Sequence, residues 1–282
     1  MALLAGWIAL FQMFGVSTRS MNTGPSLLEW LWAYYGLPAL DAEYAKLIPF
    51  AIVAILWHKR AHLLGQISET RWPSLILLGS ALVLHVAGFA AQQPSLSALG
   101  FFLGLYSLVG LTWGAQAVKE SLFPFFLLGF CLPFGSVLTD ITFWPRLFAT
   151  DVTYIVSHDL LGVPLVQHGT TLTKPDGSAF EVAAACSGMR SFSALLVVTT
   201  IFAMMALQRF WKRALLILVT VPLAAACNVM RLVVMVIADR AFGARAGELT
   251  HDSDWIFTYG VAIITIMALG RWLRRHEVSP AT

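Results

Sequence analysis

The sequence predicts an all-α polytopic membrane protein of about eight transmembrane helices, with a small extracytoplasmic segment that contains a surface helix and a β-hairpin. Hydrophobic residues make up 58% of the 282 residues and charged residues only 12%, whereas soluble domains contain about 25% charged residues. The apolar residues also gather into runs close to the roughly 20 residues that cross a bilayer. This composition argues against a disordered chain and a nucleic-acid-binding domain, and three cysteines make no disulfide framework.

Eight apolar runs are the predicted spans, and the first two are the weakest. Met1–Val16 is short, and it lacks both the basic start and the small-residue cleavage site of a signal peptide. We therefore expect a retained helix, with a cleaved signal segment as the alternative. Ala45–Trp57 needs flanking residues to cross a bilayer. The other six runs are Ser74–Ala91, Ser97–Val118, Ser121–Thr139, Ser187–Leu207, Ala214–Ala238 and Asp254–Leu273.

The loops between these spans alternate in charge, which predicts the orientation of the chain. Lys and Arg gather in cytoplasmic loops of membrane proteins. One set of alternate loops holds ten basic and three acidic residues, and the other set holds six basic and twelve acidic residues. We therefore expect a multi-pass protein of the cell inner (cytoplasmic) membrane with both termini in the cytoplasm. Its extracytoplasmic parts are then a large segment, Asp140–Ala185, and a short one, Asp239–Ser253.

The large outer segment is predicted to contain a surface helix followed by a β-hairpin. Apolar and charged residues alternate at helical spacing in Ile141–Leu161, which suits a helix lying on the membrane. Val163–Thr173 and Ser178–Val182 are rich in β-branched residues and flank the turn sequence Lys174–Gly177. We expect a single membrane domain over residues 1–282, with residues 140–185 as an insertion that leads into the helix after Cys186.

Arg231 is the clearest functional signal inside a predicted span. An arginine at the centre of a membrane helix costs about 2.5–3.5 kcal/mol on insertion scales. Asn228 precedes it by three residues and therefore shares its helix face. The alternative is an arginine that extends outward and anchors the helix end. Such an anchor on the outer side runs against the charge bias, so we interpret the pair as lining a polar site.

Cys186 is the cysteine whose surroundings favour a reactive thiolate. It stands at the predicted outer start of a helix, where backbone N–H groups stabilise an anion, and Arg190 follows one turn later. The small residues Ser187 and Gly188 leave room for a substrate chain. The alternative is a packed thiol, which is the interpretation we give to the other two cysteines, Cys131 and Cys227.

His251 lies before the last predicted span, on the same outer side. A histidine there can transfer protons near neutral pH, and the alternative is a solvated member of a helix-capping cluster. The predicted topology brings Cys186, Arg231 and His251 to the outer ends of consecutive helices. None of the three has a partner at metal-ligand spacing, so we expect neither a metal nor a cofactor.

Three motifs together resemble the exosortase/archaeosortase family of multispanning cysteine transpeptidases. They are Ala-Cys186-Ser-Gly-Met-Arg190-Ser, then Asn228-x-x-Arg231, then His251 before a last helix. The resemblance is best from about Pro164 to Arg275. It implies that Cys186 is the nucleophile and that Arg231 and His251 complete the catalytic set, supported by Arg190, Asn228, Ser187 and Gly188.

The resemblance also implies a substrate. Such enzymes cut C-terminal tripartite sorting signals, for example PEP-CTERM tails, from exported proteins at the extracytoplasmic side of the membrane. Besides these exported proteins, the lipid bilayer is the expected partner. Two alternatives come from other classes of protein: a transporter with a polar path at Asn228 and Arg231, and a noncatalytic membrane assembly protein.

Overall fold

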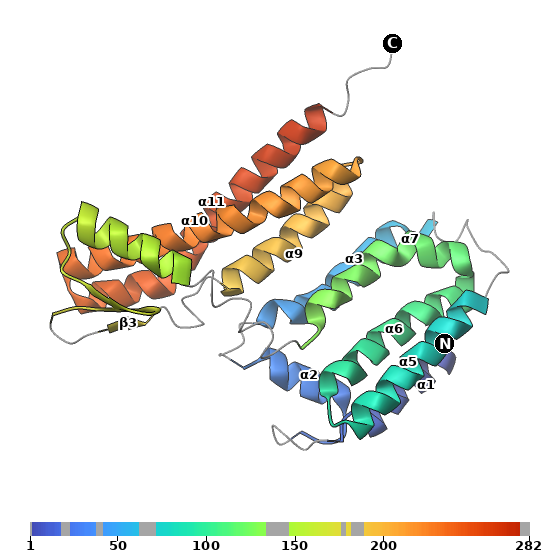
Figure 1. Cartoon of the computed structure of the whole chain (residues 1–282). Helices are drawn as coiled ribbons and strands as arrows, with labels where there is room; N and C mark the ends of the chain where they lie inside the picture. The colour runs from blue at the N-terminus through green and yellow to red at the C-terminus, as the bar shows by residue number, and fades with distance from the viewer. Residues whose placement is uncertain are drawn as a thin grey trace, which may run out of the picture. The chain divides into compact units, whose positions relative to one another are not determined.

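The computed structural model describes residues 2–17, 23–37, 42–61, 72–133, 147–175, 179–181 and 189–276. The chain divides into two compact units, Met1–Gly135 and Ser136–Thr282, and each is described by itself (Figure 1). The expectation of a single membrane domain stays a prediction. The boundary between the two units, at Gly135 and Ser136, lies a few residues before the predicted insertion at residues 140–185.

The described elements of the first unit are all helices, and the unit is built around an antiparallel pair of long helices, α5 and α6. The shorter helix α1 packs on α6, where the indole Nε1 of Trp7 donates a hydrogen bond of 3.1 Å to the carbonyl of Phe101. Phe11, on the same helix, is fully buried between Phe101 and His85. The helices are α1 (Ala2–Phe14), α2 (Leu27–Tyr35), η3 (Glu43–Leu47), α3 (Ile48–His58), α5 (Trp72–Ala90), α6 (Pro94–Trp113), α7 (Ala115–Phe126) and η4 (Leu127–Cys131).

Glycines on α6 make this packing possible. A Cβ atom at Gly100 would meet the carbonyl oxygen of Ala81, on α5, at 2.7 Å. A Cβ atom at Gly104 would overlap the indole ring of Trp7. Membrane helices approach closely where small residues face one another, and here the glycines admit both a neighbouring backbone and a large aromatic ring.

Two predicted spans of the first unit have the wrong boundaries. Ser97–Val118 was expected to be continuous, but α6 ends at Trp113 because Gly114, with φ of 90°, turns the chain. The span expected from Ser121 to Thr139 instead begins at Ala115 as α7 and passes into the 3₁₀ helix η4 just after Pro124. The sequence analysis also missed α2, whose first turn is capped by the Ser26 hydroxyl accepting from the backbone N–H of Glu29.

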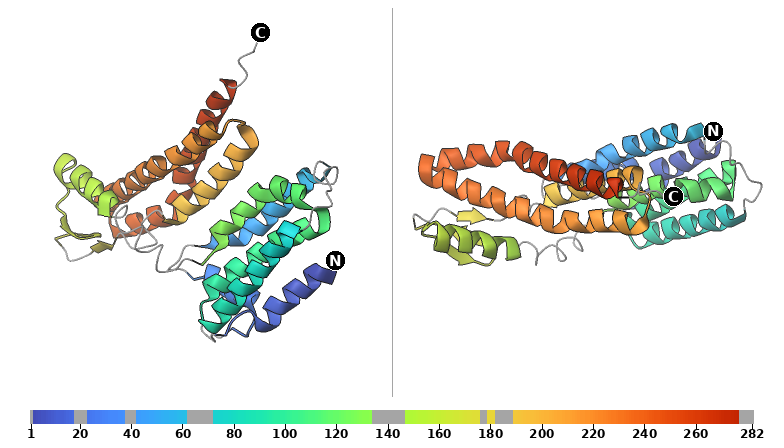
Figure 2. Two further views of the ribbon diagram at one scale, coloured as in Figure 1. Left: turned by 45° about the vertical axis from the view of Figure 1, so that its right-hand side comes forward. Right: turned by 90° about the horizontal axis from the view of Figure 1, so that it is seen from above.

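The second unit contains three long helices and a small sheet. Helix α10 packs against both α9 and α11, as two views show (Figure 2). At the end where α9 joins α10, the buried ammonium of Lys212 donates to the carbonyl of Leu273 at 2.8 Å. Residues 147–154 are helical and continue into the π-helix η5. The other elements are η5 (Ile155–Leu160), β1 (Val166–His168), β2 (Thr171–Thr173), β3 (Ala179–Glu181), α9 (Met189–Ala206), α10 (Phe210–Phe242) and α11 (Ala244–Arg275).

The sheet has three antiparallel strands in the order β1-β2-β3, where one hairpin was expected. The run Val163–Thr173 was predicted to be one strand, but it folds back on itself at Gly169, whose φ is 61°. β3 lies within the predicted second strand and pairs with β2. The helical residues 147–160 agree with the expected surface helix over the described part of that segment.

The turn between α10 and α11 is tighter than the sequence suggested. Asp239–Ser253 was expected to be a short outer segment between two helices, but these residues are helical except for Gly243. Their side of the membrane stays a prediction. Helix α10 continues to Phe242, Gly243 alone turns the chain with φ of 84°, and α11 begins at Ala244. The polar residues of the expected loop therefore extend both helices beyond their apolar parts.

Three helices of the described residues are long and apolar enough to cross a membrane, namely α5, α6 and α10. Ala2–Phe14 and Phe192–Ala206 are shorter apolar helices. The expected membrane character is therefore confirmed, whereas the count of about eight spans is not.

Replacing Gly104 by alanine tests the packing of α1 on α6. The new Cβ must displace the Trp7 ring and weaken its hydrogen bond to Phe101, so we expect a loss of about 1–3 kcal/mol of stability. Thermal unfolding in detergent, followed by tryptophan fluorescence, measures this loss. Gly79→Ala on α5 is the control, because nothing lies within 4 Å of its Cβ position. Equal stability of both variants would contradict the described packing.

Candidate functional site

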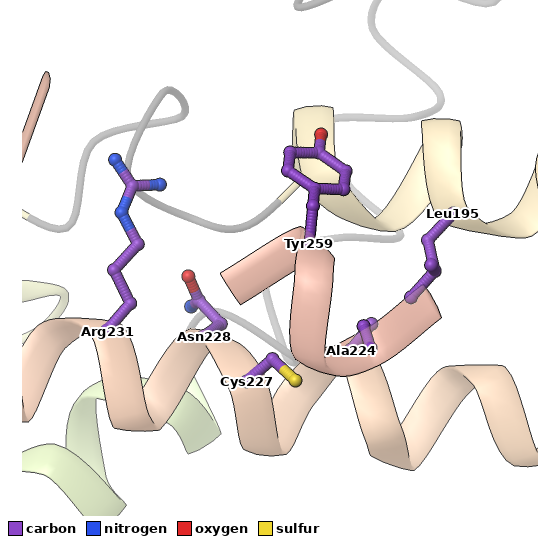
Figure 3. A pocket seen from close by; sticks show the side chains of 7 residues that line it. Leu195, Ala224, Cys227, Asn228, Arg231 and Tyr259 are labelled. Atoms are coloured by element: carbon purple, nitrogen blue, oxygen red, sulfur yellow. The ribbon is translucent and has the colours of Figure 1, made fainter. Parts of the chain in front are cut away.

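A pocket in the second unit contains the intramembrane arginine that the sequence singled out (Figure 3). It has an empty volume of about 280 Å³ including its open mouth, and the space between the side chains holds about one water molecule. Helices α9, α10 and α11 all contribute to its wall. The lining residues are Leu195, Ala224, Cys227, Asn228, Arg231, Tyr259 and Ala262.

The residues of α10 in this wall lie on one helix face. Ala224, Cys227, Asn228 and Arg231 follow the spacing i, i+3, i+4 and i+7, which repeats on one side of an α-helix. Figure 3 shows the side chains of Asn228 and Arg231 leaving α10 in the same direction. The predicted pairing of Asn228 with Arg231 on one face is therefore what the structure has.

Asn228 is the most confined polar group of the pocket. Its side chain is 5% exposed, and among the described residues neither its amide nitrogen nor its oxygen has a hydrogen-bond partner. Buried polar atoms without partners are rare, because desolvating them costs about 1–3 kcal/mol. Arg231 is half-buried one turn further along. The pocket thus combines an apolar wall with a cation and an unsatisfied amide.

The register of α10 and α11 places the backbone of His251 near this pocket. Cys227 and Tyr259, which both line the pocket, are each sixteen residues from Gly243. By the same count His251 lies level with Met235, about 6 Å further along the axis than Arg231. His251 was expected to precede the last helix, but it lies inside α11, which begins at Ala244. Its side chain lies outside the described part.

Cys186, Ser187 and Gly188 lie outside the described residues. The backbone of Arg190 belongs to the first turn of α9, and its side chain is not described. Leu195, two turns into the same helix, lines the pocket.

The other two cysteines are buried and unpaired. Cys131 is 2% exposed in the first unit, and Cys227 is 6% exposed in the wall of the pocket. Both cysteines are therefore buried, as expected for packed thiols. Among the described residues, no group of three His, Cys, Asp or Glu side chains is placed to hold a metal ion.

Two consecutive residues of α10 hold the outer segment, and the sequence analysis missed both. The carboxylate of Asp239 accepts two hydrogen bonds from Lys174 Nζ, at 2.9 and 3.0 Å, and both side chains are largely buried. Arg240 donates to the carbonyls of Leu161 and Gly162 at 3.1 and 2.9 Å. These contacts fasten the chain on either side of β1 and β2 to α10. β3 and then Cys186 follow in sequence.

The sequence analysis also missed Tyr259. Nothing in its immediate neighbours distinguishes it from an ordinary aromatic residue of an apolar helix. Tyr259 and Cys227 are the same number of residues from Gly243. Knowledge of the turn at Gly243 would therefore have placed Tyr259 beside Cys227.

Three described helices that are long and apolar enough to cross a membrane indicate a polytopic membrane protein, and one of them, α10, contributes Asn228 and Arg231 to the pocket. Comparison with known families then gives its identity: the model of the transmembrane exosortase family matches residues 39–268, and the chain belongs to that family. The match includes all the residues proposed for the site. No curated protein and no solved structure matches the chain.

Breaking the Lys174–Asp239 pair is expected to loosen the outer segment. Asp239→Asn removes one charge of a largely buried pair, and we expect a loss of about 1–2 kcal/mol of local stability, which raises cleavage by proteinase K within residues 163–181 roughly 5- to 30-fold. The exchange Lys174→Asp with Asp239→Lys should restore part of the resistance. Asp159→Asn, whose carboxylate is 59% exposed, is the control. Unchanged cleavage in Asp239→Asn would show that the pair does not hold this segment.

Proposed function

We propose that this exosortase family member is a membrane-embedded cysteine transpeptidase that cleaves C-terminal sorting signals of exported proteins. Catalysis takes place at the extracytoplasmic face of the inner membrane, by way of a thioester between substrate and Cys186. His251 acts as the general base and acid, and Arg231 stabilises the oxyanion. Arg190 favours the thiolate of Cys186, and Ser187 and Gly188 leave space for the substrate backbone.

The proton and the electron pair can be followed through each step. His251 takes the proton of the Cys186 thiol, and the thiolate attacks the scissile carbonyl carbon. The carbonyl oxygen becomes an oxyanion, to which Arg231 donates hydrogen bonds. Collapse of this intermediate breaks the C–N bond, and the leaving amine receives the proton held by His251.

The second half of the reaction releases the product. An incoming amine attacks the thioester carbon, loses its proton to His251, and expels the Cys186 thiolate, which takes that proton back. The result is a new amide on the processed protein. With water as the nucleophile, the same steps give a free carboxylate, and the enzyme acts as a protease.

One observation supports this proposal best, namely the position of Arg231. It lies half-buried in a pocket whose wall includes α9 and α11, the helices that follow Cys186 and contain His251. Arginines inside membrane helices that face a cavity usually have a function, whereas arginines that anchor a helix extend toward its end. Arg231 is also 11 residues from the end of α10 at Phe242, or about 16 Å along the axis, which is far from the outer helix end.

Cys186→Ala is expected to abolish processing of a sorting-signal substrate while leaving the amount of inserted protein unchanged. Cys227→Ala is the matched control, because Cys227 lies in the wall of the same pocket but is packed rather than activated. Immunoblotting of membranes that contain an epitope-tagged substrate measures both. Mass spectrometry of the trapped acyl-enzyme should locate the thioester at Cys186. An inactive Cys227→Ala together with an active Cys186→Ala would show that the nucleophile is wrongly assigned.

Arg231→Lys is expected to lose processing activity by about 10²-fold, as for removal of an oxyanion donor. Lysine keeps the charge but lacks the planar pair of N–H groups. The rate at which a small maleimide alkylates Cys186 should stay close to that of the original protein. A variant that processes substrate normally would mean that Arg231 only anchors its helix. Rescue by lysine, with slow alkylation of Arg231→Ala at pH 7 but not at pH 9, would assign Arg231 to thiolate stabilisation instead.

A further inference from the structure

The amide of Asn228 differs from the other buried polar groups of α10 in having no partner. The hydroxyl of Thr220, on the same helix, donates to the carbonyl of Leu216 at 3.0 Å, and the buried ammonium of Lys212 donates to the carbonyl of Leu273. Asn228 is as deeply buried as these side chains, yet both of its polar atoms remain unsatisfied. Such a group needs a partner that the described part of the chain does not supply.

The shape of the pocket limits what that partner can be. The apolar side chains of Leu195, Ala224 and Ala262 flank Asn228 on three helices, and the inner space holds about one water molecule. A partner therefore approaches from the open mouth and presents only a narrow polar edge to the amide. A carboxamide has one accepting oxygen and a donating NH₂ group. In an extended chain the N–H and the C=O of one residue point to the same side, so one residue of a main chain satisfies both.

We infer that Asn228 binds the main chain of one extended substrate residue, accepting from the N–H of that residue through Oδ1 and donating to its C=O through Nδ2. This inference rests on the proposed function, because it assumes that an extended chain enters the pocket. Asn228 is a substrate-positioning residue, separate from the groups that touch the reacting carbonyl.

The spacing along α10 predicts which peptide group is bound. Asn228 lies three residues from Arg231, about 4.5 Å further from the outer end of α10. An extended chain advances about 3.3 Å per residue. The substrate runs from its scissile bond into its own membrane helix, so Asn228 holds the N–H and C=O of a residue one or two peptide bonds on the carboxyl side of the scissile bond.

The test measures binding without cleavage. A fluorescent synthetic tripartite tail of the PEP-CTERM class is titrated against Cys186→Ala protein in nanodiscs, with and without Asn228→Ala. Parallel tails contain a backbone ester, which lacks the N–H donor, at the first or second bond after the scissile one. We expect one of the two esters to weaken binding about 10-fold when Asn228 is present. Asn228→Ala should weaken binding of the amide tail similarly and show no further loss with that ester.

Two variants separate binding from a structural role. Asn228→Leu removes both unsatisfied atoms with little change of shape, so it should unfold at a higher temperature than the parent while binding the tail as weakly as Asn228→Ala. Thr220→Val removes a satisfied hydroxyl of the same helix and should leave binding unchanged. Lower thermal stability of Asn228→Leu would show that the amide supports the fold, and would overturn the inference.

The outcomes also separate this inference from the proposed function. Ester effects that are the same with and without Asn228 overturn the inference, and cleavage by the protein with Cys186 intact then still supports the proposed function. Binding that depends on Asn228 without any cleavage supports the inference and contradicts the catalytic proposal. Absence of both binding and cleavage contradicts both.

Discussion

The packing of α10 between α9 and α11 fixes the position of every described residue of the candidate site. A single glycine turn at Gly243 sets the register between α10 and α11. This register brings Tyr259 to the level of Cys227 and Ala262 to the level of Ala224. Because helices advance by 1.5 Å per residue, a shift of one turn would move Tyr259 and Ala262 by about 5 Å and bring other residues of α11 to the wall of the pocket. The set of residues that lines the pocket therefore depends on the register between α10 and α11.

The outer segment depends on the same helix. Val236, on α10, is buried against Val163 and Leu165 at the start of the sheet, and the two residues after Ala238 bind the segment through an ion pair and two carbonyl groups. Ordering a connecting segment of more than forty residues costs much conformational entropy. Contacts at both sides of β1 and β2 hold these two strands to α10, and β3 and Cys186 follow them in sequence.

The sequence predicted those parts of the structure that depend on strong local chemistry. A charge and an amide three residues apart in an apolar run identified Arg231 and Asn228, and a lining of one pocket by both residues is what the structure has. The turn at Gly243 was not predicted, because the polar residues 239–253 are equally typical of a loop and of helix ends that extend beyond the bilayer. The end of α6 at Gly114 was missed for a similar reason, since the composition stays apolar across that break. Register and helix ends follow from tertiary packing, which composition does not contain.

In the pocket, the side chains that stabilise the second unit lie beside a group that the proposed activity needs and that lowers stability. The apolar wall of Leu195, Ala224 and Ala262 is what a stable helix bundle needs, while Asn228 introduces an uncompensated amide into it. Natural proteins stay only slightly above the stability that they need, so an unfavourable group persists where activity depends on it. In the proposed complex, the substrate main chain supplies the missing hydrogen bonds, and it gains more affinity from Asn228 than from an exposed amide because few water molecules compete inside the pocket. In the proposed mechanism, the same burial strengthens the interaction of Arg231 with a developing oxyanion. Under both proposals, depth in the bundle serves recognition and catalysis together, which accounts for a polar pair about three turns inside α10 instead of at its exposed end.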